Sequence, residues 1–370
     1  MLDDEPDSKE ELIGKPLKAL TRVSLGKWAF PYWLLILVPV SIGLSLIHFN
    51  PIVVSIVTML AMIPITSLMA KSTRDLSLRS GTIVASLLNV TFGNAFELIT
   101  GIFAIRAGLI EMVKASLIGS IVQNVLLVVG LSMVFGGFKY HEQTFNRQST
   151  SVASTMLLIA VTGLSLPTLY SGLTRESPPA MNQAVAIILG VTYLLSLVFA
   201  LFTHRHLFKT ELGVTDQVGW RTKQALLVLL LSVVLAATES NILVDSVQPV
   251  IETTGLSQAF IGLVIIAIMG NIPELMTAIT FGIRDNITQS LEIGMNSAIQ
   301  IALFAVPVLV FVSPLVGGEL SLAFAPFQMA AMILAVMIIN YIGSDGICNW
   351  LEGVQLVTVY ALIAIAFYFI

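Results

Sequence analysis

The sequence predicts an all-α polytopic membrane protein with eleven transmembrane helices, one N-terminal helix followed by two inverted five-helix repeats. The composition indicates the class: 56% of the 370 residues are hydrophobic and 11% are charged, whereas soluble domains have about 25% charged residues. The mean hydropathy is +0.93, as expected if many segments of about 20 apolar residues cross a bilayer. The repeat is directly visible, because "GNAFEL" at residues 93–98 returns as "GNIPEL" at residues 270–275.

The apolar segments divide the chain into five parts. We predict a cytoplasmic tail at 1–28, an additional first transmembrane helix at 29–49, a first repeat at 50–203, a cytoplasmic inter-repeat loop at 204–222 and a second repeat at 223–370. The spans are expected at 30–49, 51–72, 80–106, 110–135, 150–170, 181–203, 224–246, 257–283, 287–312, 321–343 and 347–369.

The basic residues predict the orientation. With the N-terminus in the cytoplasm, only Arg106, Lys114 and Arg175 of the 18 lysines and arginines fall outside, and cytoplasmic loops carry the excess of these residues in membrane proteins. The acidic tail "DDEPDSKEE" has no apolar core or cleavage site, so we predict no signal peptide. Cys348 is the single cysteine, which excludes an internal disulfide.

The repeat extends well beyond the two short motifs. Residues 93–123 align with residues 270–300 at a constant offset of 177, without a gap. Chance similarity between apolar helices matches Leu, Ile and Val, but here the matched residues include Asn94/Asn271, Glu97/Glu274, Thr100/Thr277, Ser120/Ser297 and Gln123/Gln300. Five helices are an odd number, so the second repeat enters the membrane from the opposite side. Many secondary transporters are built this way, with binding sites near the midplane between the repeats.

The matched polar residues predict the site. Glu97 and Glu274 lie within apolar helices, and an ionisable residue inside a membrane is by default a functional hypothesis. Residues three positions apart share a helix face, so each glutamate has an asparagine on its own face. We therefore predict a single chamber in which Glu97 and Glu274 bind a metal cation, lined by Asn94, Asn271, Ser120, Gln123, Asn124, Ser297 and Gln300.

This chamber offers only oxygen ligands and two negative charges, which suit a hard divalent cation such as Ca²⁺. Two carboxylates in a low-dielectric site repel each other and are poorly solvated, so protons can neutralise them as well. Either neutral form can be closed off from water, whereas the empty dianion cannot. If only the neutral forms change access, the protein is a cation/proton antiporter.

Other residues are assigned weaker roles. Asp75, Glu239 and Glu252 are candidate access-path acids, with an exposed helix-end charge as the alternative for Asp75 and Glu252. Gly93 and Gly270 are expected to loosen their helices just before the glutamates, and Pro273 removes a backbone donor in the second repeat only. For the smaller serines and threonines, helix packing is as good an explanation as ion contact.

These motifs resemble a known family. "LLNVTFGNAFELITGIFAIRAGLIEMVKASLIGSIVQNVLLVVGLSMVFGG" is similar to the first signature region of the Ca²⁺/H⁺ antiporters of the cation exchanger family, within the calcium/cation antiporter superfamily. "FIGLVIIAIMGNIPELMTAITFGI", followed by "LEIGMNSAIQIALFAVPVLV", resembles the second. The resemblance implies Ca²⁺/H⁺ exchange at Glu97 and Glu274, and second and seventh helices that slide across the core as gates. An acidic helix common in the inter-repeat loop of members is missing here.

Three alternatives remain open: a sodium-coupled or Mn²⁺ exchanger, a cation channel and an intramembrane hydrolase, although no motif supports the hydrolase. We expect no enzyme activity and no cofactor. The expected partners are calcium ions, protons and the lipid bilayer, with no nucleic acid, and the oligomeric state is not predicted. The short loops favour a prokaryotic plasma membrane, with a vacuolar membrane as the alternative.

Overall fold

The computed structural model describes residues 24–25, 28–29, 32–204 and 219–369. The predicted N-terminal tail, apart from three residues, and positions 205–218 of the predicted inter-repeat loop lie outside this range. The helices of the first half are η1 (Tyr32–Ile36), α2 (Leu37–Leu46), α3 (Pro51–Ser77), α4 (Thr82–Gly93), α5 (Ala95–Arg106), α6 (Ile110–Gln123), η2 (Asn124–Val128), α7 (Val129–Gly137), α8 (Arg147–Thr174), α9 (Pro179–Val198) and η3 (Phe199–Thr203).

The helices of the second half are α10 (Thr222–Thr254), α11 (Gln258–Phe260), η5 (Ile261–Ile266), α12 (Ala267–Gly270), α13 (Ile272–Ile283), α14 (Ile287–Gln300), η6 (Ile301–Ala305), α15 (Val306–Val312), η7 (Ser313–Val316), α16 (Pro326–Ile342) and α17 (Trp350–Tyr368). Two antiparallel pairs of two-residue strands complete the described structure: β1 (Ser24–Leu25) with β2 (Trp28–Ala29), and β3 (Gln143–Thr144) with β4 (Ile347–Cys348).

The predicted all-α membrane class is confirmed. Among the described residues, seven continuous helices are long and apolar enough to cross a membrane, and two bent pairs of helices bring the number to nine. The apolar helices Tyr32–Leu46 and Pro326–Ile342 fall at the remaining two predicted spans but are shorter. The protein is therefore a multi-pass membrane protein, and the count of eleven full spans stays a prediction.

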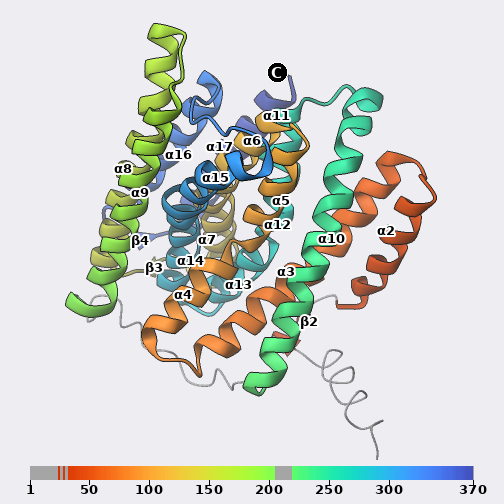
Figure 1. Ribbon diagram of the computed structural model, residues 1–370. Coiled ribbons are helices and arrows are strands. Elements are labelled where there is room, and N and C mark those ends of the chain that lie inside the picture. Colours follow the sequence, from red (N-terminus) through yellow and green to blue (C-terminus); the bar gives the residue numbers. More distant parts are fainter. Residues whose placement is uncertain (1–23, 26–27, 30–31, 205–218, 370) are drawn as a thin grey trace, which may run out of the picture.

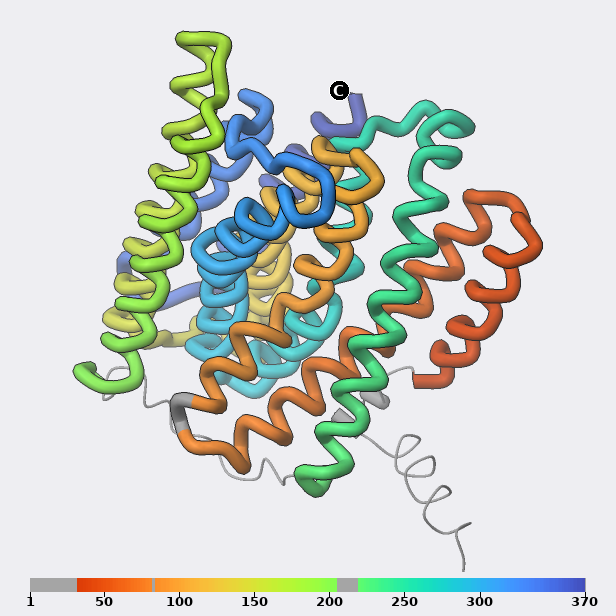
Figure 2. Tube along the Cα trace, viewed as in Figure 1, coloured from red at the N-terminus to blue at the C-terminus, as the bar shows by residue number. Residues whose placement is uncertain are grey.

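The helices form a central group with one peripheral group on each side (Figures 1 and 2). The broken helices α4–α5 and α11–α13 lie in the middle with α6–α7 and α14–α15, while α8 and α9 lie at one edge. The long helices α3 and α10 pack along each other on the opposite side, with α2 outside them. Ser55 on α3 and Ser246 on α10 share a hydrogen bond of 2.6 Å across this pair.

The ends of the helices follow from local chemistry. Asn50, Asn146 and Asn349 cap α3, α8 and α17, each accepting hydrogen bonds from two backbone N–H groups of the first turn. Helix α10 runs eight residues beyond the predicted end at 246, and stops only where Gly255 adopts a φ of 73°, a conformation that favours glycine.

The repeat seen in the sequence is also a repeat of helix boundaries. Adding 177 to the bounds of α5, α6 and η2 gives those of α13, α14 and η6 without a shift. The π-helical segments η2 and η6 therefore recur at one position in each half. Helices α5 and α13 point toward opposite faces in Figure 1, as the inverted repeat requires.

Glycine allows two helices of different repeats to touch in the core. A Cβ atom at Gly119 on α6 would collide with the backbone of Leu263 on η5, and one at Gly262 would collide with the Met112 carbonyl oxygen. Leu263 and Met112 are both buried. The backbones of α6 and η5 therefore meet directly, which is the usual way for membrane helices to gain packing energy.

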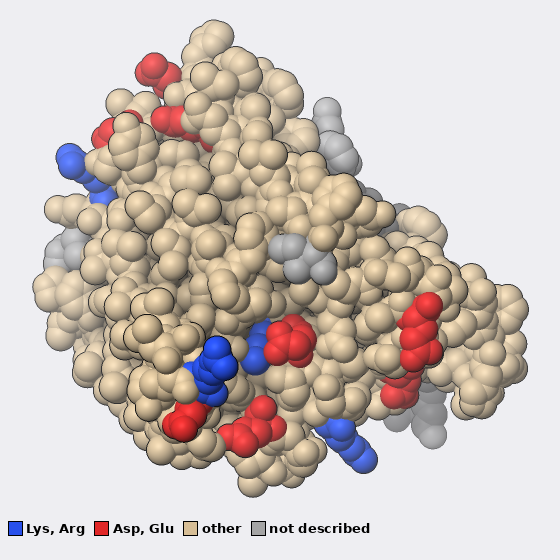
Figure 3. Space-filling view, turned by 90° about the horizontal axis from the view of Figure 1, so that it is seen from above, with Lys and Arg blue, Asp and Glu red and all other residues tan. Residues whose placement is uncertain are grey.

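The charged side chains are few on the one face that the space-filling view shows. Figure 3 shows the face at the top of Figure 1, where charged side chains lie in small, separate groups on an otherwise uncharged surface. The C-terminal end of α3, with Lys71 and Arg74, lies at the opposite face. The orientation in the membrane stays a prediction.

We expect Gly119→Ala and Gly262→Ala each to destabilise the protein by about 1–3 kcal/mol, because the added methyl group has no space. Gly190→Ala on α9 is the matched control, since nothing lies within 4 Å of its Cβ position and alanine favours a helix. Thermal unfolding of the purified variants measures the difference. Equal melting temperatures for all three variants would contradict the close packing of α6 on η5.

Candidate functional site

Both bent helices break at an asparagine. Asn94 separates α4 from α5 with φ −114° and ψ 26°, and Asn271 separates α12 from α13 with φ −103° and ψ 14°. The helices bend by 45° and 58° at these points. Glu97 and Glu274 consequently lie in the first turns of α5 and α13, where the helix dipole favours a negative charge.

The two glycines lie directly before the breaks. Gly93 and Gly270 are the last residues of their helices, and the breaks follow at Asn94 and Asn271, just before the glutamates. A Cβ at Gly270 would lie 2.5 Å from the ring of Phe96 and 2.9 Å from Glu97 Oε1, whereas the nearest atom to a Cβ at Gly93 is 3.6 Å away. Gly270 therefore allows the first repeat's acid to approach the second repeat's break, and Gly93 has no such role.

The predicted polar lining residues do come together, and hydrogen bonds join most of them. Asn94 Nδ2 donates to Gln300 Oε1 at 2.8 Å. Asn124 Nδ2 lies 2.8 Å from Asn271 Oδ1 and 3.0 Å from Ser297 Oγ. Asn271 Nδ2 donates to Ser120 Oγ at 3.2 Å. Asn124 thus connects the two repeats. In the sequence, only its position beside Gln123 indicated that it would reach the site.

Several polar atoms in this cluster are buried without a hydrogen-bond partner. They are both amide atoms of Gln123, Oδ1 of Asn124 and Oε2 of Glu274. Such atoms are uncommon in folded proteins and call for a specific explanation. Three of the four are oxygens of carboxylate or amide groups, the ligands that Ca²⁺ prefers.

The electrostatics of the cluster are those of two uncompensated acids. Glu97 is 8% exposed, and its Oε1 lies 2.9 Å from the Cβ position of Gly270, four residues before Glu274. Within the described residues, no lysine or arginine pairs with either glutamate. The arrangement can therefore hold a divalent cation or two protons, but it is unfavourable when both carboxylates are charged and no cation is present.

A cavity of about 620 Å³ reaches this cluster from one side. It lies between α3, α4, α13 and α14, and its lining includes the exposed Arg74, the partly buried Lys71 and the partly buried Glu274. Gln289, Glu292 and Asn296 line it along one face of α14. Glu97 does not line the cavity, so the two acids differ in their access to water.

The pathway related to this cavity by the repeat is closed. Subtracting 177 converts Gln289, Glu292 and Asn296 into Met112, Ala115 and Gly119. Met112 and Ala115 are buried, and Gly119 is packed on η5. The open side is therefore polar, and its closed counterpart consists of small or apolar residues.

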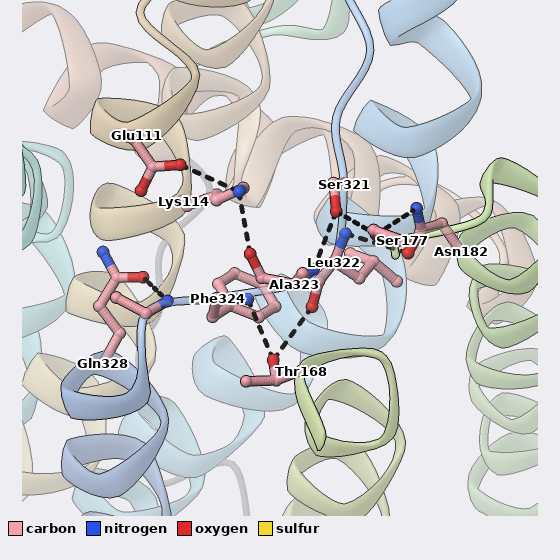
Figure 4. A network of polar contacts seen from close by, with 11 residues as sticks. Glu111, Lys114, Thr168, Ser177, Asn182, Ser321, Leu322, Ala323, Phe324 and Gln328 are labelled. Atoms are coloured by element: carbon pink, nitrogen blue, oxygen red, sulfur yellow. Dashed lines mark hydrogen bonds and ion pairs between the residues drawn. The ribbon is translucent and has the colours of Figure 1, made fainter. Parts of the chain in front are cut away.

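A folded loop covers the closed end (Figure 4). Lys114 Nζ on α6 donates to the Ala323 carbonyl oxygen at 2.9 Å and to Glu111 Oε1 at 3.0 Å. Thr168 Oγ1 accepts from Phe324 N at 3.0 Å, and Asn182 Oδ1 accepts from Leu322 N at 3.2 Å. The loop between η7 and α16 is thereby tied to α6, α8 and α9, a role for Lys114 that sequence reasoning missed.

The three candidate access-path acids lie outside the cavity lining. Asp75 is buried, 3.6 Å from Lys71 Nζ, and its Oδ2 accepts from Trp220 N at 3.0 Å. Glu239 is fully buried between helices, with Ser41 Oγ of α2 donating to its Oε1 at 2.6 Å.

Glu252 is exposed and accepts from Gln248 Nε2 at 3.1 Å. The acid that lines the path with Glu274 is Glu292, which could have been found from its spacing to Asn296 on α14.

The chain is similar to known proteins over most of its length. The chain is 35% identical to a Ca²⁺/H⁺ antiporter from Aphanothece halophytica over 93% of this chain and 98% of that protein. It is 36% identical to the Ca²⁺/H⁺ antiporter ChaA from Bacillus subtilis over 90% of this chain and 96% of that protein. A vacuolar calcium ion transporter from Schizosaccharomyces pombe is 33% identical over 91% of this chain and 84% of that protein.

Solved structures share the fold. Native YfkE superposes with a TM-score of 0.80 at 33% identity, covering 91% of this chain and 99% of that chain. The H⁺/Ca²⁺ exchanger CAX gives a TM-score of 0.68 at 15% identity, covering 91% of this chain and 92% of that one, a likeness of fold alone. The sodium/calcium exchanger protein family matches residues 50–202 and 224–369. The chain therefore belongs to the sodium/calcium exchanger protein family.

Proposed function

We propose that this protein exchanges Ca²⁺ for H⁺ across a membrane, and that Glu97 and Glu274 bind either one Ca²⁺ or protons. The observation that carries the proposal is the pairing of two acids on symmetry-related helix breaks, with no basic partner among the described residues. The names of the relatives at 35% and 36% identity point to the same pair of ions.

The one-sided cavity supports exchange over a channel. Water reaches Glu274 from the face with Lys71 and Arg74, while buried packing at Met112 and Gly119 closes the related pathway. A channel needs a pathway open at both ends, whereas an antiporter must keep one end closed while the other is open. With the predicted orientation, this structure is the state open to the cytoplasm.

In that state the site would load Ca²⁺ through its polar side. Glu292 and the amides of Asn296 and Gln300 line the approach, and Glu274 would be the first of the two acids to meet the ion. Closure around the ion would then bring in Glu97, which Gly270 allows to approach. Proton binding to the two acids would neutralise the site for the return step.

We expect Glu97→Gln and Glu274→Gln each to reduce Ca²⁺ transport by at least about 100-fold, because a single carboxylate leaves a buried divalent ion with an uncompensated charge. Uptake of Ca²⁺ into liposomes with the purified variants measures this. Glu252→Gln is the control, since Glu252 is exposed and outside the cavity lining. Wild-type rates in either test variant would rule out this assignment of the acids.

A pH gradient should drive Ca²⁺ uptake into liposomes against its own gradient with no sodium on either side, because protons and Ca²⁺ neutralise the same two carboxylates. Uptake that requires sodium and ignores pH would instead establish the sodium-coupled alternative. Ca²⁺ flow that never exceeds its own gradient, whatever the pH difference, would indicate a channel.

Gly270→Ala should weaken the apparent Ca²⁺ affinity by about tenfold, since overpacking next to Phe96 and Glu97 costs about 1–3 kcal/mol. Gly93→Ala, at the related position, should leave the affinity nearly unchanged because its Cβ has space. The Ca²⁺ dependence of proton-driven uptake compares the two. Equal losses in both would show that Gly270 does not position Glu97.

A further inference from the structure

Gln123 is the one polar residue of the predicted lining whose side-chain amide has no partner on either atom. It is 0% exposed, and both Nε2 and Oε1 are buried without a hydrogen bond. Leaving a buried polar group unpaired costs its full desolvation energy. A bound cation would satisfy Oε1 but not Nε2, so ion binding alone does not explain this residue.

Its counterpart in the other repeat has a hydrogen-bond partner. Gln300 Oε1 accepts from Asn94 Nδ2 at 2.8 Å. The corresponding partner of Gln123 would be Asn271. In this structure, however, Asn271 is bonded to Asn124 and Ser120, and the counterpart of Asn124 is Ile301, which has no polar atom to compete for Asn94.

The difference between the two halves coincides with the difference in access. Gln300, which is bonded to Asn94, lines the open cavity. Gln123, without partners, lies on the closed side, where it is fully buried. The polar groups needed for the same arrangement are present in both halves, but only one half has formed it.

We propose that Gln123 is a state-dependent positioning residue: when access changes sides, Asn271 exchanges Asn124 for Gln123, while Gln300 releases Asn94. In each state, the glutamine–asparagine hydrogen bond would be formed in one half of the site and absent in the other. This proposal rests on the proposed function only in that the protein alternates its access, and it does not depend on which ions are carried.

The related variants Gln123→Leu and Gln300→Leu test it, because they should act in opposite directions. In ion-free protein, Gln300→Leu should lower the melting temperature by removing the formed bond to Asn94, whereas Gln123→Leu should leave it unchanged or raise it. Gln300→Met and Gln123→Met are milder variants with the same expected signs, in case a leucine variant folds poorly.

Access is measured with single cysteines in a Cys348→Ala background. Asn296→Cys probes the open cavity, and Ser116→Cys probes the closed pathway. A hydrogen bond lost from one state should change the ratio of the two states about fivefold. Labelling by a membrane-impermeant thiol reagent at Asn296→Cys should therefore fall in Gln300→Leu and stay high in Gln123→Leu, while labelling at Ser116→Cys should change in the opposite sense.

Transport then separates the proposal from its rivals. Gln123→Leu should lower the maximal exchange rate severalfold with little change in apparent Ca²⁺ affinity from the cavity side. A large loss of affinity would make Gln123 an ion ligand instead. An unchanged rate with unchanged labelling would make it a packing residue, and either result overturns the proposal. If the protein carries other ions, the labelling result still stands or fails by itself.

Discussion

Two carboxylates in a region without basic partners are the constraint on which the rest of this structure depends. Neither Glu97 nor Glu274 has a lysine or arginine beside it among the described residues, so their charge must be neutralised by something that enters and leaves. The helix breaks at Asn94 and Asn271 place each acid at a positive helix end. The cavity reaches Glu274 but not Glu97, and on the proposed function this difference controls when each acid meets water.

The two repeats use one scaffold in two different ways. Their helix bounds agree at a fixed offset, yet Asn94 has one side-chain partner in the cluster and Asn271 has two. A protein that alternates between two faces cannot be symmetric in either state, because a symmetric arrangement would be open or closed on both sides. Part of the unequal hydrogen bonding comes from the sequence, because Asn124 bonds to Asn271 and its counterpart is Ile301.

Much of this could be predicted from the sequence, because the repeat preserves polar residues within apolar helices. The class, the family and the meeting of Asn94, Asn271, Ser120, Ser297 and Gln300 near the two acids followed from that pattern. Asp75 and Glu239 do not line this cavity, which could not be foreseen because sequence alone does not show which side of a helix faces a neighbour. Asp75 turns to Lys71 and Trp220, and Glu239 turns to Ser41 of α2. Lys114 bonds to a loop more than 200 positions away, and no local sequence pattern predicts such a contact.

The bonds between α3 and α10 have a mechanical consequence. Near one end of the pair, Ser55 is joined to Ser246. Near the other end, Asp75 of α3 holds the backbone of Trp220, just before α10, while Lys71 lies over the Trp220 ring at 4.5 Å. Contacts near both ends of the pair oppose a change in its crossing angle and an independent rotation of either helix. We therefore expect α3 and α10 to move together, so that a displacement of either helix is transmitted to both faces of the membrane.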